Sequence, residues 1–370
     1  MKIGVLVTSI SNFGKNGFYN SQEIGLAKEL DHLFNKVTIY KLIPKEEKLT
    51  FEKVVGCNNT TLKLIPSKNF GINGFIDLNQ LDDNIDALVY FSDTQLSVPK
   101  VYKWCTKNKI KFIPYIGVVT SHSNSILKKK VIDFMFKRNI QIYRESQCIV
   151  KTPSVVEELK KYGVKNCKVA PVGLDISLLN EKYAESSIVD LKNKWGFKNN
   201  ENIILFIGRL VTEKQPFKLL KVFMKIHEKD PTYKLVIVGD GLLLDEICQF
   251  ISNKGLNSAI KIIKKIPNDQ IWELYRISNA FVNLNSQEIF GMAILEAMYY
   301  ECKVVAIEAP GPSFILENKI DGILCETEQD IIDGVFYCDL NITSKAHRKV
   351  LKNFTWEPVA ETIDKLVRSC

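Results

Sequence analysis

Short apolar runs rich in β-branched residues alternate with segments of helical spacing along most of the chain. Residues 2–8, 36–42 and 85–91 form such runs in the first half, and residues 202–208 begin a second series. Continuous apolar runs of this length are typical of parallel strands that are buried on both faces. Strands that alternate with helices predict a parallel sheet wound on both faces, so the sequence predicts an α/β protein.

The chain length predicts two domains, because 370 residues are more than one hydrophobic core usually takes. Residues 176–187 are polar and broken in pattern, and we interpret them as the linker. We therefore expect Rossmann-like doubly wound domains over residues 1–180 and 181–350, facing each other across a cleft. Residues 351–370 contain an amphipathic helix that we expect to cross back onto the first domain.

Composition narrows the class of protein. The chain is 46% hydrophobic and 25% charged, which is ordinary for a globular protein. No apolar run approaches the roughly 18 residues of a membrane span, and the first residues do not resemble a signal peptide. Nine scattered cysteines without a C-x-x-C pair indicate reduced thiols, so we expect a cytoplasmic protein.

The net charge of +8 fits phosphorylated ligands, an anionic membrane or nucleic acid. Nucleic acid is not expected, because no basic motif interleaved with aromatic residues is visible.

Residues 286–301 carry the strongest candidate site. An apolar strand at 280–284 leads into a loop with Glu288, and Gly291 opens a helix that carries Glu296 among apolar neighbours. A helix start offers free N–H groups and partial positive charge to a phosphate, and carboxylates can accept hydrogen bonds from sugar hydroxyls. We interpret the stretch as a nucleotide-sugar site. The alternative is an ordinary strand-to-helix turn in which Glu296 pairs with a buried lysine or a backbone amide.

Two cations follow the strand at residues 202–208. Arg209 and Lys214 could clamp a diphosphate, or they could be surface charge. Gly239 lies in a tight Gly-Asp-Gly turn after the next strand, at residues 234–238.

The first half offers weaker candidates. His122 lies in the loop at residues 117–125, beyond a strand end where open α/β sheets bind ligands, although a lone loop histidine is often only solvated. Gly17 lies in a loop that is not G-x-G-x-x-G, so a dinucleotide site is not supported, and a simple turn is as good an interpretation as a ligand loop.

Residues 126–145 predict a helix with a basic face and an apolar face. Three lysines at 128–130 and the pair Lys137 and Arg138 flank the apolar run at 131–136. Such a helix could lie on an anionic membrane. We favour the alternative, in which it packs its apolar side on the sheet.

Four motifs occur in a characteristic order in the second half. They are Phe-Ile-Gly-Arg-Leu (206–210) with Lys214, Val-Gly-Asp-Gly (238–241), Glu-x₇-Glu with Phe-Gly (288–296), and Gly-Pro-Ser (311–313) followed by Asp-Gly (321–322). Over residues 200–367 the chain resembles the retaining family-4 glycosyltransferases of GT-B architecture, which build bacterial glycans, glycolipids and surface polysaccharides. The first half resembles them weakly.

The resemblance implies a role for each candidate residue. Arg209 and Lys214 would bind the donor diphosphate and stabilise the leaving group. Glu288 would hold the donor sugar, Glu296 the ribose, and His122 would lie near the transferred sugar. Gly17 and Gly239 would also belong to the donor site, as would the turn and helix start formed by Ile289, Phe290, Gly291, Met292 and Ala293. Neither a metal nor another cofactor is implied, so the leaving-group charge would be met by the two cations and the helix start.

Three positions depart from the family pattern. Gly17 is followed by Phe18 where a second glycine is usual, Lys264 replaces a glycine, and Phe314 replaces a common glutamate. The first departure weakens the phosphate role of Gly17, and the second bears on recognition of the base.

We expect a retaining, metal-independent hexosyl- or N-acetylhexosaminyltransferase. It would use a nucleotide diphosphate sugar, most simply a UDP-sugar, and a hydroxyl of a glycan, glycolipid or glycoprotein acceptor in polysaccharide synthesis. It would be cytoplasmic, and residues 126–145 are the segment that could make a peripheral contact with an anionic membrane. One alternative is a non-catalytic partner subunit that binds glycan or stabilises an active transferase. Another is a UDP-sugar epimerase, which would need acid–base carboxylates that the sequence does not identify.

Overall fold

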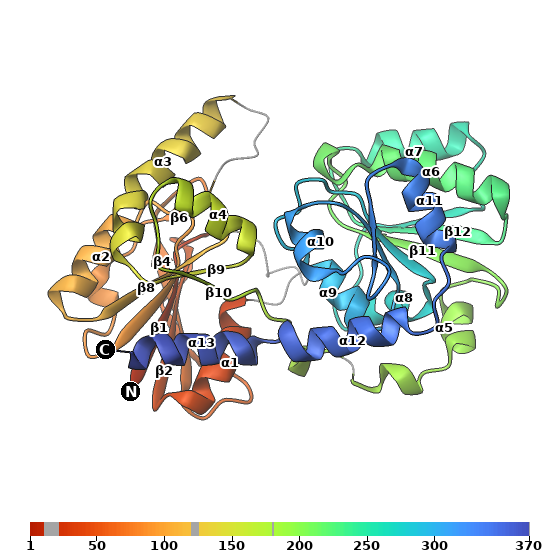
Figure 1. Cartoon of the computed structure of the whole chain (residues 1–370). Coiled ribbons are helices and arrows are strands. Elements are labelled where there is room, and N and C mark those ends of the chain that lie inside the picture. The colour runs from red at the N-terminus through yellow and green to blue at the C-terminus, as the bar shows by residue number, and fades with distance from the viewer. Residues whose placement is uncertain (11–21, 120–125, 180, 370) are drawn as a thin grey trace. The chain divides into compact units, whose positions relative to one another are not determined.

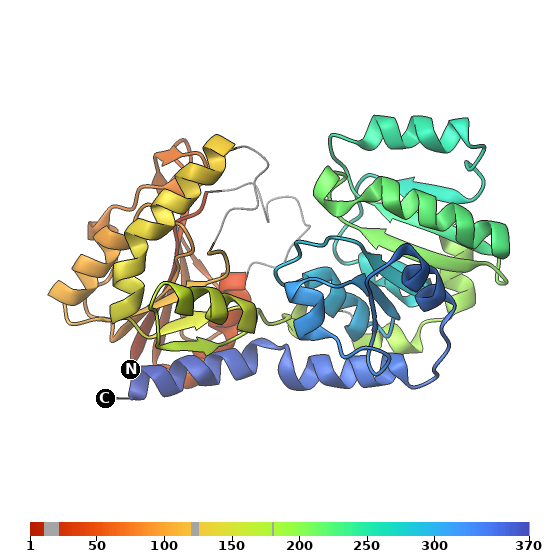
Figure 2. The ribbon, with the colours of Figure 1, turned by 45° about the horizontal axis from the view of Figure 1, so that its top comes forward.

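The computed structural model describes residues 1–10, 22–119, 126–179 and 181–369 (Figure 1). The chain forms two compact units. The first unit comprises Met1–Asp175 together with Thr355–Cys370, and the second comprises Ile176–Phe354. Each unit is built on a sheet of mainly parallel strands with helices on both faces (Figure 2). The predicted doubly wound α/β fold is therefore confirmed.

The first unit contains an eight-stranded sheet with the strand order β10-β9-β8-β7-β1-β2-β4-β3. Its strands are β1 (Lys2–Val7), β2 (Lys36–Pro44), β3 (Thr50–Lys53), β4 (Thr60–Ser67), β7 (Ala87–Phe91), β8 (Lys111–Ile116), β9 (Cys148–Val150) and β10 (Cys167–Val169). All neighbours are parallel except β3 and β4. The apolar pattern did not predict β3, because all four of its residues are exposed at the edge of the sheet. A small hairpin, β5 (Asn69–Phe70) and β6 (Asn73–Gly74), lies outside this sheet.

The helices of the first unit cover both faces of its sheet (Figures 1 and 2). They are α1 (Gln22–Leu33), α2 (Val98–Lys107), α3 (Ile126–Glu145), α4 (Pro153–Lys161) and α13 (Trp356–Arg368). One core cluster joins α2, α3 and α4 to strand residues such as Leu88 and Tyr90. On α3, Phe136 and Tyr143 are buried in this cluster, whereas Phe134 is exposed. Much of the apolar side of α3 therefore packs on the protein, as the favoured interpretation expected.

The C-terminal helix α13 packs against α1, so the prediction that it returns to the first domain is confirmed. Its first residue, Trp356, lies directly over two glycines that come from distant parts of the sequence. A Cβ atom added to Gly25 would collide with the Trp356 side chain, and one added to Gly173 would collide with the Trp356 backbone. These two positions admit the helix only because both lack a side chain.

The second unit contains a six-stranded, fully parallel sheet with the strand order β13-β12-β11-β14-β15-β16. Its strands are β11 (Asn202–Ile207), β12 (Tyr233–Val238), β13 (Ile260–Ile263), β14 (Ala280–Asn283), β15 (Val304–Ile307) and β16 (Ile323–Cys325). Because all strands are parallel, the loops that follow β11, β12, β14 and β15 leave the sheet at one edge. The predicted donor-site residues of this unit lie at this edge or on the helix that follows it.

The helices of the second unit also cover both faces of its sheet. They are α5 (Ile188–Lys194), α6 (Pro216–Lys229), α7 (Leu244–Asn253), α8 (Ile271–Ile277), α9 (Met292–Tyr299), α10 (Pro310–Ile315), α11 (Glu328–Phe336) and α12 (Ile342–Asn353). One core cluster contains apolar residues of α6, α7 and α11, and α8 and α9 contact strands β11, β14 and β15. The analysis of the sequence had not predicted α11 and α12. Within the described ranges, no helix combines the length and apolar character needed to cross a bilayer.

Candidate functional site

Lys214 and Glu288, two of the predicted site residues, form an ion pair in the second unit. The Lys214 Nζ lies 2.6 Å from the Glu288 Oε2. Lys214 ends a short 3₁₀ helix after β11, η4 (Thr212–Lys214), and Glu288 lies in the loop after β14. Because β11 and β14 are adjacent and parallel, both loops emerge at the same edge of the sheet. Lys214 is thus a paired and partly buried cation, and its role toward a diphosphate stays a prediction.

Two asparagines that the sequence analysis missed support the same carboxylate. The side-chain amides of Asn285 and Asn283 lie 3.1 and 3.5 Å from the Glu288 Oε2. The Asn283 Oδ1 accepts from the backbone N–H of Asn285, and the Asn285 Oδ1 accepts from that of Gln287. Both asparagines are buried. The signal in the sequence was two amides spaced by one residue at the end of an apolar strand.

The start of α9 presents backbone N–H groups beside this ion pair. Gly291 precedes the helix with a φ of +111°, a conformation that favours glycine. Within the described part of the chain, the backbone amides of residues 290–293 have no hydrogen-bond acceptor. An anion could therefore accept from several of them at a point where the helix dipole also favours negative charge.

The loop before α9 contacts the start of α10 through its backbone. The Gly311 N–H donates to the Glu288 carbonyl oxygen over 2.7 Å. A Cβ atom on Gly311 would collide with the backbone of Phe290, so the two segments approach each other backbone to backbone. The turn that carries Glu288 and Phe290 is thus positioned by main-chain contacts from a separate loop.

Arg209 and Gly239 lie on neighbouring loops of the same edge, after β11 and β12. The Arg209 side chain is exposed, and it forms no ion pair with any residue that the structure describes. Gly239 has a φ of +155°, and a Cβ atom there would collide with the carbonyl oxygen of Gly208. Arg209 is therefore available to an anion, while Gly239 allows the two loops to approach closely.

Glu296 lies on α9, half-buried, and among the described residues its partner is a tyrosine, where the sequence suggested a lysine or a backbone amide. The Tyr275 hydroxyl lies 3.0 Å from the Glu296 Oε2 and 3.3 Å from the Ala293 carbonyl oxygen. Burial raises the pKa of Glu296 from 4.5 to about 7, and the hydrogen bond from Tyr275 opposes this shift. The carboxyl group can therefore change its charge near neutral pH.

Some of the remaining predicted site residues lie in the described part of the chain, and others lie outside it. Ile289, Phe290, Met292 and Ala293 lie at the turn and helix start described above. His122 and Gly17 fall within residues 120–125 and 11–21, outside the described part of the chain, and their predicted roles stay predictions.

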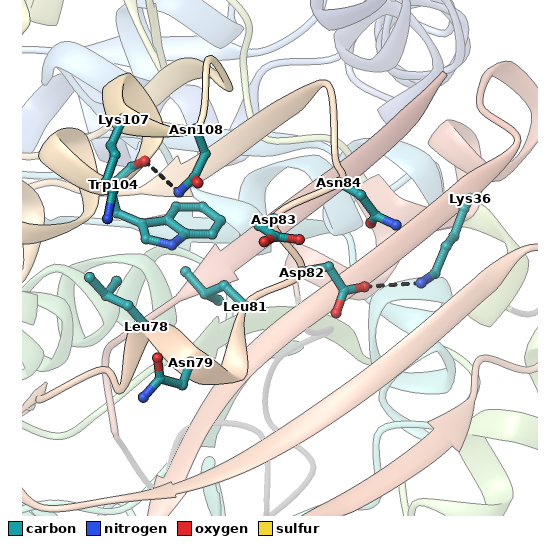
Figure 3. A pocket seen from close by; sticks show the side chains of 10 residues that line it. All are labelled: Lys36, Leu78, Asn79, Leu81, Asp82, Asp83, Asn84, Trp104, Lys107 and Asn108. Atoms are coloured by element: carbon teal, nitrogen blue, oxygen red, sulfur yellow. Dashed lines mark hydrogen bonds and ion pairs between the residues drawn. The ribbon is translucent and has the colours of Figure 1, made fainter.

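A pocket of about 740 Å³ lies in the first unit, and none of the predicted site residues lines it (Figure 3). It is open at the amino-terminal edge of the sheet, because its walls include Lys36 at the start of β2 and the segment before β7. Asp82 pairs with Lys36 over 2.9 Å, and Trp104 and Lys107 contribute from the end of α2. The pocket therefore lies at the edge of the sheet opposite to the carboxyl ends of the strands. The sequence predicted a ligand loop at those carboxyl ends, not at this pocket.

Comparison with known proteins extends these observations. Residues 188–354 match the family described as "Glycosyl transferases group 1". The chain is 32% identical over 174 residues to "Glycosyltransferase 1 domain-containing protein 1" of Xenopus tropicalis, covering 45% of this chain and 50% of that protein. It is 22% identical over 290 residues to the alpha-monoglucosyldiacylglycerol synthase of Streptococcus pneumoniae, covering 78% of this chain and 64% of that protein. The chain thus spans between half and two thirds of the length of these curated relatives.

A solved structure of similar architecture is that of Anabaena HepE, crystallised with UDP and glucose. It superposes with a TM-score of 0.72 at 16% identity, and all of both chains is covered. At this identity the likeness shows the fold, which is the GT-B arrangement of two parallel α/β sheets. The match to the group 1 glycosyl transferases covers most of the second unit, which holds the Lys214–Glu288 pair and the start of α9, so the chain is similar to that family over this unit.

Proposed function

We propose that this protein is a retaining glycosyltransferase that moves a sugar from a UDP-sugar to a hydroxyl group of an acceptor. The observation that carries this proposal is the convergence of Lys214, Glu288 and the open backbone amides of α9 at one sheet edge. A diphosphate needs cations and N–H donors, and a sugar needs a carboxylate that accepts from its hydroxyls. The site offers both within one loop cluster.

The reaction needs stabilisation of the negative charge that develops on the leaving nucleoside diphosphate. Arg209, Lys214 and the start of α9 would supply it, because fixed cations and N–H groups stabilise such charge without reorganising. Glu288 would orient the donor sugar through its hydroxyls, with Asn283 and Asn285 holding the carboxylate in place. Glu296 would accept from the ribose. His122 and Gly17 are proposed to contribute from the first unit. This arrangement requires no metal ion.

The donor is proposed to carry UDP, and UDP-glucose is the first candidate. HepE, which has the same fold, was crystallised with UDP-glucose. The name of the pneumococcal relative describes a synthase of monoglucosyldiacylglycerol. The acceptor is accordingly proposed to be a hydroxyl of a glycan, a glycolipid or a glycoprotein.

Peripheral contact with an anionic membrane on its cytoplasmic side is proposed for α3. Phe134 is 70% exposed and Val131 is 46% exposed, although other apolar residues of the helix are buried. Lys130 and Lys137 are exposed beside them. Exposed apolar groups next to cations are the features by which a helix binds the interface of an anionic bilayer.

The test is the melting temperature of the protein with UDP-, GDP-, ADP- and dTDP-sugars, with and without a chelator, because a ligand that binds only the native state raises it. We expect selective stabilisation by a UDP-sugar that the chelator leaves unchanged. The same donor should then support transfer to a glycan or glycolipid acceptor with retained anomeric configuration. A folded protein that none of these donors stabilises would contradict the proposal and favour a non-catalytic partner subunit.

A further inference from the structure

The Tyr275 hydroxyl contacts Glu296 from the neighbouring helix α8. It lies 3.0 Å from the Glu296 Oε2 and 3.3 Å from the carbonyl oxygen of Ala293, in the first turn of α9. Tyr275 is buried, with only 1% of its surface exposed. A single phenolic group therefore contacts both a proposed donor-binding carboxylate and the backbone next to the proposed phosphate site.

In the described part of the chain, aromatic neighbours hold the ring of Tyr275. It stacks on Tyr300, with centroids 5.9 Å apart and planes at 19°, and it meets the Phe281 ring of β14 edge-on at 5.8 Å. Such pairs add to the free energy gained by burial alone and restrict the orientation of the ring. The hydroxyl consequently has a fixed position relative to α9 and β14, the two elements that flank Glu288.

One phenolic hydrogen serves two acceptors, so it can be donated to only one of them at a time. When Glu296 is ionised, its carboxylate is the stronger acceptor and takes the hydrogen bond. When Glu296 is protonated, its own hydroxyl can donate to the Tyr275 oxygen while Tyr275 donates to Ala293. The Glu296 Oε2 is thus satisfied in both protonation states.

The second carboxylate oxygen of Glu296 differs from the first. In the described part of the chain, the Glu296 Oε1 has no hydrogen-bond partner. It is also not a fully buried atom. The carboxylate therefore has one oxygen anchored by Tyr275 and one that is open to an incoming hydroxyl. An anchored carboxylate loses less conformational freedom when it accepts that hydrogen bond.

We infer that Tyr275 is a positioning residue that sets the ribose specificity of the donor site, by holding Glu296 so that its Oε1 accepts from a ribose hydroxyl. This inference rests on the proposed function, because it takes the assignment of Glu296 to the ribose from there. It adds a residue that no motif in the sequence singled out. It also adds a ligand property that the residue controls, namely the preference for ribonucleotides over deoxyribonucleotides.

The test compares the affinities of the protein for UDP, 2′-deoxy-UDP and 3′-deoxy-UDP by titration calorimetry. The native protein should bind UDP at least about tenfold more tightly than one of the deoxy forms, because the bound nucleotide covers the Glu296 Oε1 and a deoxy form offers it no hydroxyl. Tyr275→Phe should weaken UDP binding several-fold and leave binding of that deoxy form unchanged. The ratio of the affinity for UDP to the affinity for the deoxy form should therefore fall. In a Glu296→Ala background, Tyr275→Phe should leave the ratio unchanged, because it acts through the carboxylate.

Tyr233→Phe is the matched control, because it removes a phenol from a buried tyrosine of the same unit. It should leave the ratio of affinities at the native value. A Tyr275→Phe protein with a lower melting temperature but the native ratio would overturn the inference and leave Tyr275 a structural role. A native protein that binds all three nucleotides equally would overturn it as well. No binding of UDP at all would instead contradict the proposed function.

Discussion

Lys214 and Glu288, separated by 74 residues in the sequence, are joined by an ion pair of 2.6 Å between adjacent strand ends. Their side chains are 22% and 18% exposed, so the pair is only partly screened by water. A cation proposed to meet the diphosphate and a carboxylate proposed to meet the sugar thus neutralise each other in the unliganded site. Each also keeps the other in position for the donor.

Replacement of Lys214 by methionine should remove the charge and keep the length of the side chain. We expect kcat/KM for the donor to fall about 10²–10³-fold, because a fixed cation facing the leaving group is lost. The melting temperature should change little, because the amides of Asn283 and Asn285 still contact Glu288. Lys225→Met is the control, since Lys225 pairs with Glu328 on the surface of the same unit. Native turnover in the Lys214 variant would contradict the site assignment.

Glu296 should make stability depend on pH in the unliganded protein. Its pKa is raised from 4.5 to about 7, so between these values the folded state binds more protons than the unfolded state. The contribution of this group is therefore fully present below pH 4.5 and is lost as the pH rises to about 7. Glu296→Gln should remove this component from the variant, so the difference in unfolding free energy between native protein and variant, measured by denaturant titration across pH 4–8, should change between pH 4.5 and about 7. A pH-independent difference would contradict the prediction.

Gly311→Ala should disturb the donor site from a position outside it. The added methyl group would collide with the backbone of Phe290, so the turn before α9 must shift. We expect weaker binding of UDP, measured by calorimetry, together with a lower melting temperature. Gly255→Ala is the control, because Gly255 also lies in the second unit and nothing lies within 4 Å of its added Cβ. Since Gly255 has a φ of +67°, this control should cost about 1 kcal/mol of stability but leave UDP affinity unchanged.

Phe134→Ser should weaken the proposed contact of α3 with membranes. We expect the native protein to sediment with vesicles of phosphatidylcholine and phosphatidylglycerol, and less so as salt is added, because salt screens the lysines. The serine variant should bind several-fold less. Phe70→Ser is the control, because Phe70 is 69% exposed elsewhere in the same unit, compared with 70% for Phe134. Equal binding of both variants and the native protein would remove α3 as the contact.

The elements that the sequence predicted best are those with a strong apolar pattern. The runs at residues 2–8 and 202–208 became β1 and β11, because strands buried on both faces must be apolar throughout. The segment at residues 50–53 became the edge strand β3 without any such pattern, since all its residues are exposed. Helices α11 and α12 were missed, although each buries one apolar face in the second unit.

The sequence alone determined the α/β class, the parallel strands and the residue types of the candidate site, because backbone periodicity and motif spacing are local properties. Only the tertiary structure decided which groups meet. It paired Lys214 with Glu288 and brought Tyr275 from another helix to Glu296. It also placed the amides of Asn283 and Asn285 in contact with the Glu288 carboxylate. These contacts depend on the order of strands in the sheet and on how helices pack against it. Such arrangements follow from the packing of the whole core, which no single stretch of sequence contains.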